Sequence, residues 1–208
     1  MVAAFKGRPD PIELLIKSNE LRLPELVPIR TARMLTSPFA SLRGSVTVMG
    51  SDLSHTPTTG IGVQACGDCH LMNFGAFATP ERKLIFDING FDETLPAPWE
   101  RDLKRLAASF AVAANYIEVT QTDIWAACES AVRSYRRSMF RYSQMRVLDI
   151  WYDHVDVEQV IAGFPEPHWQ KRWRERIAKE QARSVVEYDF PKLAARRGVG
   201  LESKTTRH

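Results

Sequence analysis

The sequence predicts an α+β fold that is mostly helical, with a small β-hairpin beside a polar loop. Apolar residues recur at helical spacing in several long segments, whereas two short apolar runs flank a proline-containing turn at 78–82. The 208 residues are 44% hydrophobic and 25% charged, which is ordinary for a globular protein. A chain of this length buries about 70% of its unfolded surface, enough for one core with a helical extension.

The N-terminal part is expected to contain two helices. The first covers 11–26, and its apolar residues are spaced for one face: Ile12, Leu15, Ile16 and Leu23. Ser37 is a preferred capping residue and Pro38 a preferred first helical residue, so a second helix is expected from Pro38 through Leu53.

The middle of the chain is expected to form strands. Residues 59–65 are a short, partly apolar run that we expect to be a buried strand leading into a loop. Residues 73–77 and 83–86 then flank the polar turn and predict a hairpin, which would return Asp87 to the side of Asn73.

The C-terminal half is expected to be helical. A proline-rich connection at 96–98 leads to helices over 99–116, 122–142 and 168–187. The stripe of the second of these is Ile124, Ala127, Ala131 and Tyr135. We therefore expect a core at 1–120, a helical extension at 121–195 and a disordered tail at 196–208.

The candidate catalytic residues are Asp68, Asn73 and Asp87. Asp68 stands five residues before Asn73, and Asp87 ends the short apolar run that follows. Phosphoryl-transfer enzymes of the protein-kinase type use such a set: one Asp accepts the substrate hydroxyl proton, and the Asn and a later Asp bind Mg²⁺. The spacing predicts Asp68 as the base and Asn73 and Asp87 as metal ligands. A tight turn with incidental polar residues is the plain alternative.

The same segment also reads Cys66-Gly67-Asp68-Cys69-His70, the pattern of covalent haem attachment. Haem attachment needs export, and the N-terminal residues show no apolar signal region. The Cys and His spacing does not fit a zinc site either. We therefore expect neither haem nor zinc.

These residues resemble the catalytic and metal-binding loops of the aminoglycoside phosphotransferase and choline kinase branch of kinase-like folds, and more closely the bacterial family called domain of unknown function 2252. The phrases that carry the second resemblance are Leu42-Arg43-Gly44, Gly67-Asp68-x-His70-x-x-Asn73-Phe74-Gly75, Phe86-Asp87-x-Asn89 and Asp102-Leu103-Lys104-Arg105. The resemblance implies a catalytic (C-terminal) kinase-like lobe that uses Mg²⁺ and ATP. In it His70 shapes the loop, Asp102 braces it from a helix, and Arg43 contacts the cofactor.

Three arginines before the loop have two open interpretations. Arg30, Arg33 and Arg43 could bind an anionic substrate through paired hydrogen bonds. Ion pairing with the acidic residues at 92, 93 and 102 explains them equally well.

This chain also departs from the pattern of the family. Gly90 stands where the family usually has Asp, and Cys66 where many kinase-like relatives have His. The glycine-rich segment and Lys-bearing strand expected for gripping nucleotide phosphates are missing. We therefore expect a truncated member that is inactive or weak alone, with an unknown small-molecule or protein acceptor and a separately encoded nucleotide-binding segment as partners. Whether it is an enzyme stays open.

Two other functions are kept as alternatives: a non-catalytic remnant or regulatory lobe, and a nucleic-acid-binding helical module. Arginines and aromatic residues alternate over 133–146, yet acidic residues dilute the charge, so we expect a solvated basic face with Trp125 and Trp169 or Trp173 buried. The net charge of +3 is slight, and nucleic-acid binding is not expected. The absence of long apolar runs and of a signal predicts a cytoplasmic protein without a membrane partner.

Overall fold

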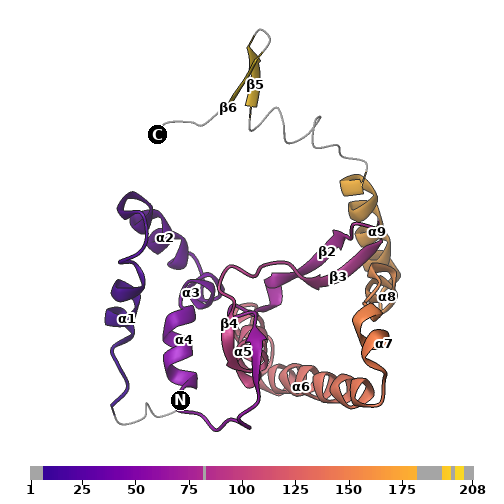
Figure 1. The fold of residues 1–208 in the computed structure, drawn as a ribbon, viewed down its shortest axis with the longest axis horizontal. Helices are drawn as coiled ribbons and strands as arrows, with labels where there is room; N and C mark the ends of the chain where they lie inside the picture. Colours follow the sequence, from indigo (N-terminus) through magenta and orange to yellow (C-terminus); the bar gives the residue numbers. More distant parts are fainter. Residues whose placement is uncertain (1–6, 82, 182–193, 198–199, 204–208) are drawn as a thin grey trace. The chain divides into compact units, whose positions relative to one another are not determined.

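The computed structural model describes residues 7–81, 83–181, 194–197 and 200–203, and it confirms a mostly helical α+β fold (Figure 1). The chain forms two compact units, residues 1–154 and 155–208. The candidate catalytic loop lies wholly in the first unit.

The N-terminal helices are shorter than the sequence predicts. Helix α1 (Pro11–Ser18) is followed by a short 3₁₀-helix η1 (Pro24–Leu26) and by α2 (Val27–Met34). The helix expected over 38–53 is divided at Ser45, whose backbone is not helical, into α3 (Pro38–Gly44) and α4 (Val46–Leu53). The predicted cap is confirmed, because the Ser37 hydroxyl accepts a hydrogen bond from the Ala40 amide at 3.0 Å.

Two antiparallel strand pairs follow. Strands β2 (Phe74–Ala78) and β3 (Leu84–Ile88) form the predicted hairpin, in which Gly75 lies opposite Asp87. Strand β1 (Gly62–Ala65) pairs with β4 (Leu95–Pro98), a segment that we expected to be a connection without strand structure. Pro96 and Pro98 are tolerated there because each strand of a two-stranded sheet has one unpaired edge.

The expectation that residues 59–65 form a buried strand was wrong. Gly62, Val63 and Gln64 are exposed, and of β1 only Ala65 is buried. A strand with a single partner and no covering layer leaves most of its side chains in solvent.

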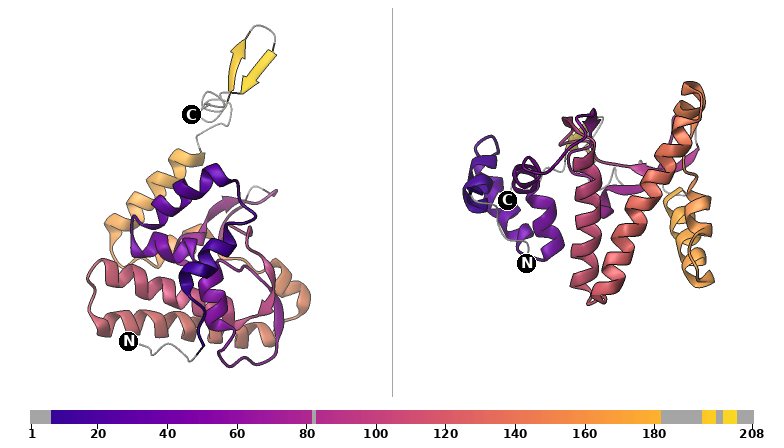
Figure 2. Two further views of the ribbon diagram at one scale, coloured as in Figure 1. Left: turned by 90° about the vertical axis from the view of Figure 1, so that its left-hand side faces the viewer. Right: turned by 90° about the horizontal axis from the view of Figure 1, so that it is seen from below.

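Two long helices complete the frame of the first unit. Helix α5 (Glu100–Tyr116) packs antiparallel against α6 (Gln121–Ser143), as the view from below in Figure 2 shows. The Thr120 hydroxyl caps α6 by accepting from the Asp123 amide at 3.2 Å. Of the predicted stripe, Ile124 is buried, Ala131 and Tyr135 are half-buried and Ala127 is exposed. The expected burial of Trp125 was wrong, because this side chain is 68% exposed. Trp125 follows Ile124 directly, so it lies about 100° around the helix and off the packed face. Helix α7 (Val147–Tyr152) ends the unit.

The core of the first unit lies where α3, α4 and α5 meet the loop after β1. The α5 helix contacts α3, α4 and α6. The buried residues here combine small apolar groups with polar ones: Ala65, Cys66, Cys69, His70, Ala97, Arg105 and Ser109. The candidate catalytic loop is thus part of the core and not a surface turn.

The second unit contains α8 (Val157–Ala162), α9 (Pro167–Gln181) and the hairpin of β5 (Ala194–Arg197) with β6 (Gly200–Ser203). The end of the helix expected over 168–187 lies outside the described residues, as do 198–199 and 204–208 of the expected tail. Phe164 stacks on Trp173 at 6.0 Å between ring centroids. Trp169 and Trp173 are nevertheless 41% and 38% exposed, so the expected burial was wrong.

Among the helices that the structure describes, we find none with the length and hydrophobicity of a membrane span.

Candidate functional site

The loop is anchored at its start by the first turn of α5. The Asp102 carboxylate accepts hydrogen bonds from the Cys66 amide at 2.7 Å and the Gly67 amide at 3.1 Å. Gly67 has φ +82°, and a Cβ there would overlap the Glu93 carbonyl oxygen. Only glycine satisfies both conditions, because it tolerates positive φ and carries no side chain. Asp102 therefore occupies the bracing position that the resemblance implies.

Asp68 is held by a buried arginine. Arg105 is 2% exposed, and its Nε donates to Asp68 Oδ1 at 2.8 Å while Nη2 donates to the same oxygen. Asp68 Oδ2 lies 3.4 Å from Nε2 of His70. Burial raises the pKa of Asp68, but the hydrogen bonds from His70 and Arg105 outweigh it and hold the pKa below its ordinary value. Asp68 is therefore ionised at neutral pH.

His70 connects the loop to its surroundings. Its ring is 2% exposed and packs edge-on against Phe39, with 5.7 Å between centroids. Nδ1 accepts from the Met72 amide at 3.1 Å, so the ring proton belongs on Nε2, which faces Asp68. One residue further on, the Leu71 amide donates to Ser109 Oγ of α5 at 2.9 Å. These contacts fix the shape of the loop.

Asn73 is tied to the loop through its amide nitrogen. Nδ2 donates to the carbonyl oxygen of Asp68 at 3.2 Å, to that of Gly90 at 3.0 Å and to Cys66 Sγ at 3.4 Å. Three acceptors around one atom identify it as the nitrogen, so Oδ1 is the atom left for a cation. A Cβ at Gly90 would lie 2.6 Å from this Oδ1. A residue with a side chain at position 90 would therefore need a different arrangement of Asn73.

Asp87 lies on the hairpin near Asn73. It pairs with Gly75 in the sheet, and the Asn89 amide donates to the Asn73 carbonyl at 2.8 Å. A Cβ at Gly75 would overlap the Asn89 side-chain amide, which places Asn89 over the same face as Asp87. Asp87 is exposed, and its Oδ1 accepts from the Ile88 amide at 2.7 Å. Asn89 is a further polar side chain on this face, with Nδ2 as its atom nearest to Gly75, and its alternation with Asp87 along the strand is the sequence signal for it.

A cation at this point would rely on few protein ligands. Among the described residues, no three His, Cys, Asp or Glu side chains are grouped to hold a metal ion. The available set is a carboxylate from Asp87 with the amide oxygen of Asn73. Mg²⁺ suits such a set because it usually keeps several waters and binds substrate phosphates.

The two cysteines of the loop act as small buried side chains. Cys66 and Cys69 are each 5% exposed and free. Cys66 Sγ donates to the Gly90 carbonyl at 3.3 Å. Burial raises the pKa of Cys66, and it raises the pKa of Cys69 to about 12. Both thiols are therefore protonated at neutral pH, and a protonated thiol is a poor nucleophile and a poor metal ligand.

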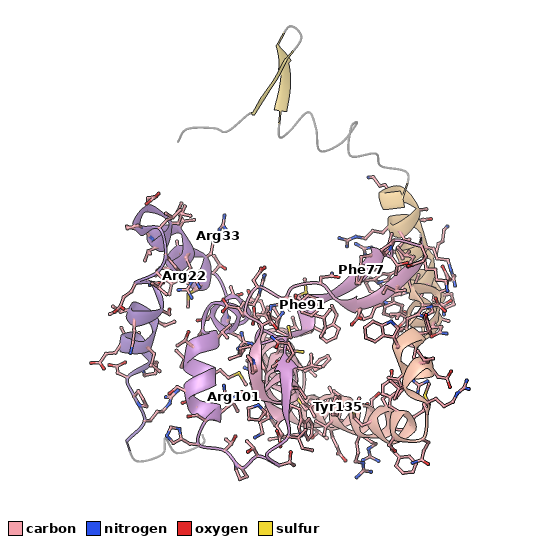
Figure 3. All side chains as sticks on the ribbon, viewed as in Figure 1. Arg22, Arg33, Phe77, Phe91, Arg101 and Tyr135 are labelled. Carbon is pink, nitrogen blue, oxygen red and sulfur yellow. The ribbon has the colours of Figure 1, made fainter. Side chains whose placement is uncertain are left out.

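A cavity of about 720 Å³ has Asp68 among its lining residues. Its lining includes four arginines, Arg22, Arg30, Arg33 and Arg43. Figure 3 shows Arg22 and Arg33 near one another beside α2. Arg43, which the sequence assigned to cofactor binding, thus lies beside the candidate base. Asn73 and Asp87 are not among the lining residues.

Sequence reasoning missed Arg105 as the partner of Asp68. A signal was present, because Arg105 stands three residues after Asp102 and therefore shares its helix face. Arg22 was missed as well. It lies 3.8 Å from Glu93, one of the acidic residues that we considered as a partner for the other arginines.

The first unit is thus a helical domain in which an aspartate-bearing loop is braced by a helix and flanked by a β-hairpin. The chain belongs to the family described as uncharacterized protein conserved in bacteria (DUF2252), which it matches over residues 22–206. No curated protein and no solved structure matches it. The catalytic and metal-binding roles of Asp68, His70, Asp102, Asn73 and Asp87 remain predictions.

Proposed function

We propose that this chain provides the catalytic lobe of a kinase-like phosphotransferase that uses Mg²⁺ and ATP. The observation that carries the proposal is the hydrogen bond of 3.2 Å from Asn73 Nδ2 to the Asp68 carbonyl. It joins the candidate base and a candidate metal ligand in one rigid unit, which Asp102 anchors to α5. Phosphoryl transfer depends mainly on such positioning and on charge neutralisation.

Asp68 would receive the acceptor hydroxyl. In the reaction, the hydroxyl oxygen forms a bond to the γ-phosphorus of ATP, the bond from that phosphorus to the β–γ bridging oxygen breaks, and ADP leaves. The hydroxyl proton passes to Asp68. Arg105 donates twice to Oδ1, whereas Oδ2 has only the longer contact of 3.4 Å with His70 Nε2, so Oδ2 is the oxygen that would accept the hydroxyl. The lowered pKa of Asp68 suits orientation of the hydroxyl and late proton transfer more than early deprotonation.

The metal would be held by Asn73 and Asp87. Bound Mg²⁺ would neutralise the phosphate charge as the transfer proceeds. Two observations favour this set: the Asn73 amide is oriented so that Oδ1 is available, and Asp87 is exposed on the hairpin.

A non-catalytic lobe is the second candidate, and one observation favours it. None of the six strands in the described part of the chain contains a lysine. Kinase-type sites use a strand lysine and backbone amides to hold the nucleotide phosphates. A lobe that lacks these phosphate-binding groups could bind a partner or a metal without catalysing phosphoryl transfer.

The metal site can be tested by titrating the protein with Mn²⁺ and ATP and following free Mn²⁺ by electron paramagnetic resonance. We expect Asp87→Ala to weaken Mn²⁺ binding about tenfold or more, because it removes the only carboxylate of the proposed set. Glu129→Ala is the matched control, since Glu129 is an exposed acid on α6. Equal Mn²⁺ affinity in the wild type and Asp87→Ala would refute the proposed metal site.

A further inference from the structure

The cavity beside Asp68 combines positive charge with an apolar wall. It is formed by the segment from η1 to α3 and by the loop. Arg30 and Arg33 are three residues apart on α2 and so share a helix face, and Arg43 comes from the last turn of α3.

Two of the charges near this cavity are already neutralised. Arg22 lies 3.8 Å from Glu93. Asp68, the one acid among the lining residues, pairs with Arg105 from the core. In each of these two ion pairs the positive and the negative charge cancel, so neither pair adds a net charge to the cavity.

The other three arginines keep their charge. Arg30 donates to Asn19 Oδ1 at 3.0 Å and to the Gly44 carbonyl, which are both neutral acceptors. Burial and the nearby positive charge of Arg22 lower the pKa of Arg30, and the charge of Glu93 opposes them in part. A bound anion would oppose them further, because it favours the charged guanidinium. Among the residues that the structure describes, Arg33 and Arg43 have no ion-pair partner. The cavity therefore offers two guanidinium groups without an ion-pair partner, Arg33 and Arg43, and a third, Arg30, that shares the charge of Glu93 with Arg22.

The apolar wall lies next to these charges. It consists of Leu23, Leu26, Ile29 and Met34. Leu23 is 60% exposed, Leu26 50% and Ile29 49%. A ligand with an apolar segment would remove part of this surface from water, which is favourable in proportion to the area buried.

We infer that this cavity binds the phosphate acceptor, and that the acceptor is a hydroxyl compound in which a phosphate or carboxylate group is attached to a short apolar segment. The role as acceptor rests on the proposed function. It follows from the position of Asp68, which lines the cavity, whereas Asn73 and Asp87 do not. The base faces the acceptor, and the metal ligands face the nucleotide phosphates. Arg43 is thereby reassigned from cofactor to acceptor.

The anion site can be tested without metal or nucleotide. Inorganic phosphate and n-butyl phosphate would be titrated by calorimetry at constant ionic strength. We expect butyl phosphate to bind about tenfold more tightly than phosphate, because its chain covers the apolar wall. The double variant Arg33→Gln/Arg43→Gln should weaken both ligands about tenfold or more.

Two control variants make this result specific. Arg136→Gln/Arg137→Gln removes the same charge from exposed positions on α6 and should leave both affinities unchanged. Leu26→Asn/Ile29→Gln should abolish the advantage of butyl phosphate and leave inorganic phosphate unaffected. Equal weakening by the two arginine pairs would overturn the inference, as would a loss confined to Mg-ATP, which would assign the arginines to the nucleotide.

A last measurement separates this inference from the proposed function. Mn²⁺ at the metal site should broaden the ³¹P signal of bound butyl phosphate, and Asp87→Ala should abolish the broadening without changing the affinity. Binding without broadening would leave the anion cavity in place and refute its neighbouring metal site. Broadening that persists in Asp87→Ala would contradict Asp87 as a metal ligand and with it the proposed function, while the anion cavity would stand on the affinities alone.

Discussion

At the scale of single residues, the pairing of Asp68 with Arg105 gives the candidate base a second role. Arg105 is 2% exposed, and Asp68 is its carboxylate partner. A buried charge that loses its partner destabilises a protein strongly. Loss of activity after substitution of Asp68 would therefore report folding as well as catalysis.

We predict that Asp68→Ala lowers the free energy of unfolding by about 3 kcal/mol, because it leaves Arg105 buried without a counter-charge. Urea denaturation followed by circular dichroism measures this. The double variant Asp68→Ala/Arg105→Met should recover much of the loss, since it removes both charges. Asp92→Ala, at an exposed position, is the control and should change stability by less than about 0.5 kcal/mol. Additive losses in the double variant would contradict the pairing.

The contribution of the Asp68–Arg105 pair to the free energy of unfolding should depend on pH. The pKa of Asp68 is lower in the folded state than in the unfolded chain, so its contribution to stability is present above the unfolded pKa of about 4 and is lost as the pH falls through the folded pKa. The stability difference between the wild type and Asp68→Asn should be largest at neutral pH and shrink in acid below about pH 4. A difference that stays constant from pH 7 to pH 3 would show that Asp68 is not the group that titrates.

At the scale of elements, the loop depends on a close backbone approach between Gly67 and the segment before β4. Gly67 and Gly60 both have positive φ, +82° and +80°, but only at Gly67 does a Cβ meet other atoms. The two glycines therefore separate the cost of backbone conformation from the cost of a clash.

We predict that Gly60→Ala costs about 1 kcal/mol, the usual penalty for a side chain at positive φ. Gly67→Ala should cost about 3 kcal/mol or more, because its Cβ would also overlap the Glu93 carbonyl and push the loop away from Asp102. Thermal unfolding of both variants measures the difference. Similar losses at the two positions would show that the loop and the Glu93 segment separate easily.

Elements with strong local signals could be predicted from the sequence, and elements that depend on distant partners could not. The α5 helix and the β2–β3 hairpin are set by periodicity and by a turn, so their bounds were nearly right. Strand β4 exists because β1 pairs with it across 30 residues, and nothing local in a proline-rich segment indicates that. The burial of β1 failed for the same reason, since it depends on which layers cover the strand.

The candidate site shows the same division. The spacing of Asp68, Asn73 and Asp87 was readable because the loop and hairpin are local. The partner of Asp68 was not, since Arg105 reaches the loop from a helix 37 residues later. The arginine cavity was predicted only in part. The sequence drew attention to Arg30, Arg33 and Arg43 but left their partners open. The structure shows that Glu93 contacts Arg22 and that Asp102 accepts hydrogen bonds from backbone amides.

At the scale of the whole molecule, the proposed function assigns to the described residues one half of what kinase-type chemistry needs. Asp68, Asn73 and Asp87 would supply the base and the metal ligands, whereas the described strands offer no lysine for the nucleotide phosphates. Mg-ATP would be held mainly through the metal beside an exposed hairpin. Attraction between unit charges at ~4 Å is only about 1 kcal/mol in the dielectric of bulk water.

We therefore predict that the 208-residue chain binds Mg-ATP with a Kd of about 1 mM or weaker, and that its phosphotransfer to small hydroxyl acceptors is negligible. Equilibrium titration and release of ADP in the presence of butyl phosphate derivatives that carry a hydroxyl group would measure the two quantities. A glycine-rich, lysine-bearing segment of the kind that kinases use, supplied in trans, should tighten nucleotide binding, because backbone amides and a lysine then share the phosphate charge. Asp87→Ala should remove that gain. Glu129→Ala should keep it. Rapid magnesium-dependent turnover by the chain alone would show that the described residues already contain the nucleotide site, and the search would move to the cationic cavity beside Asp68.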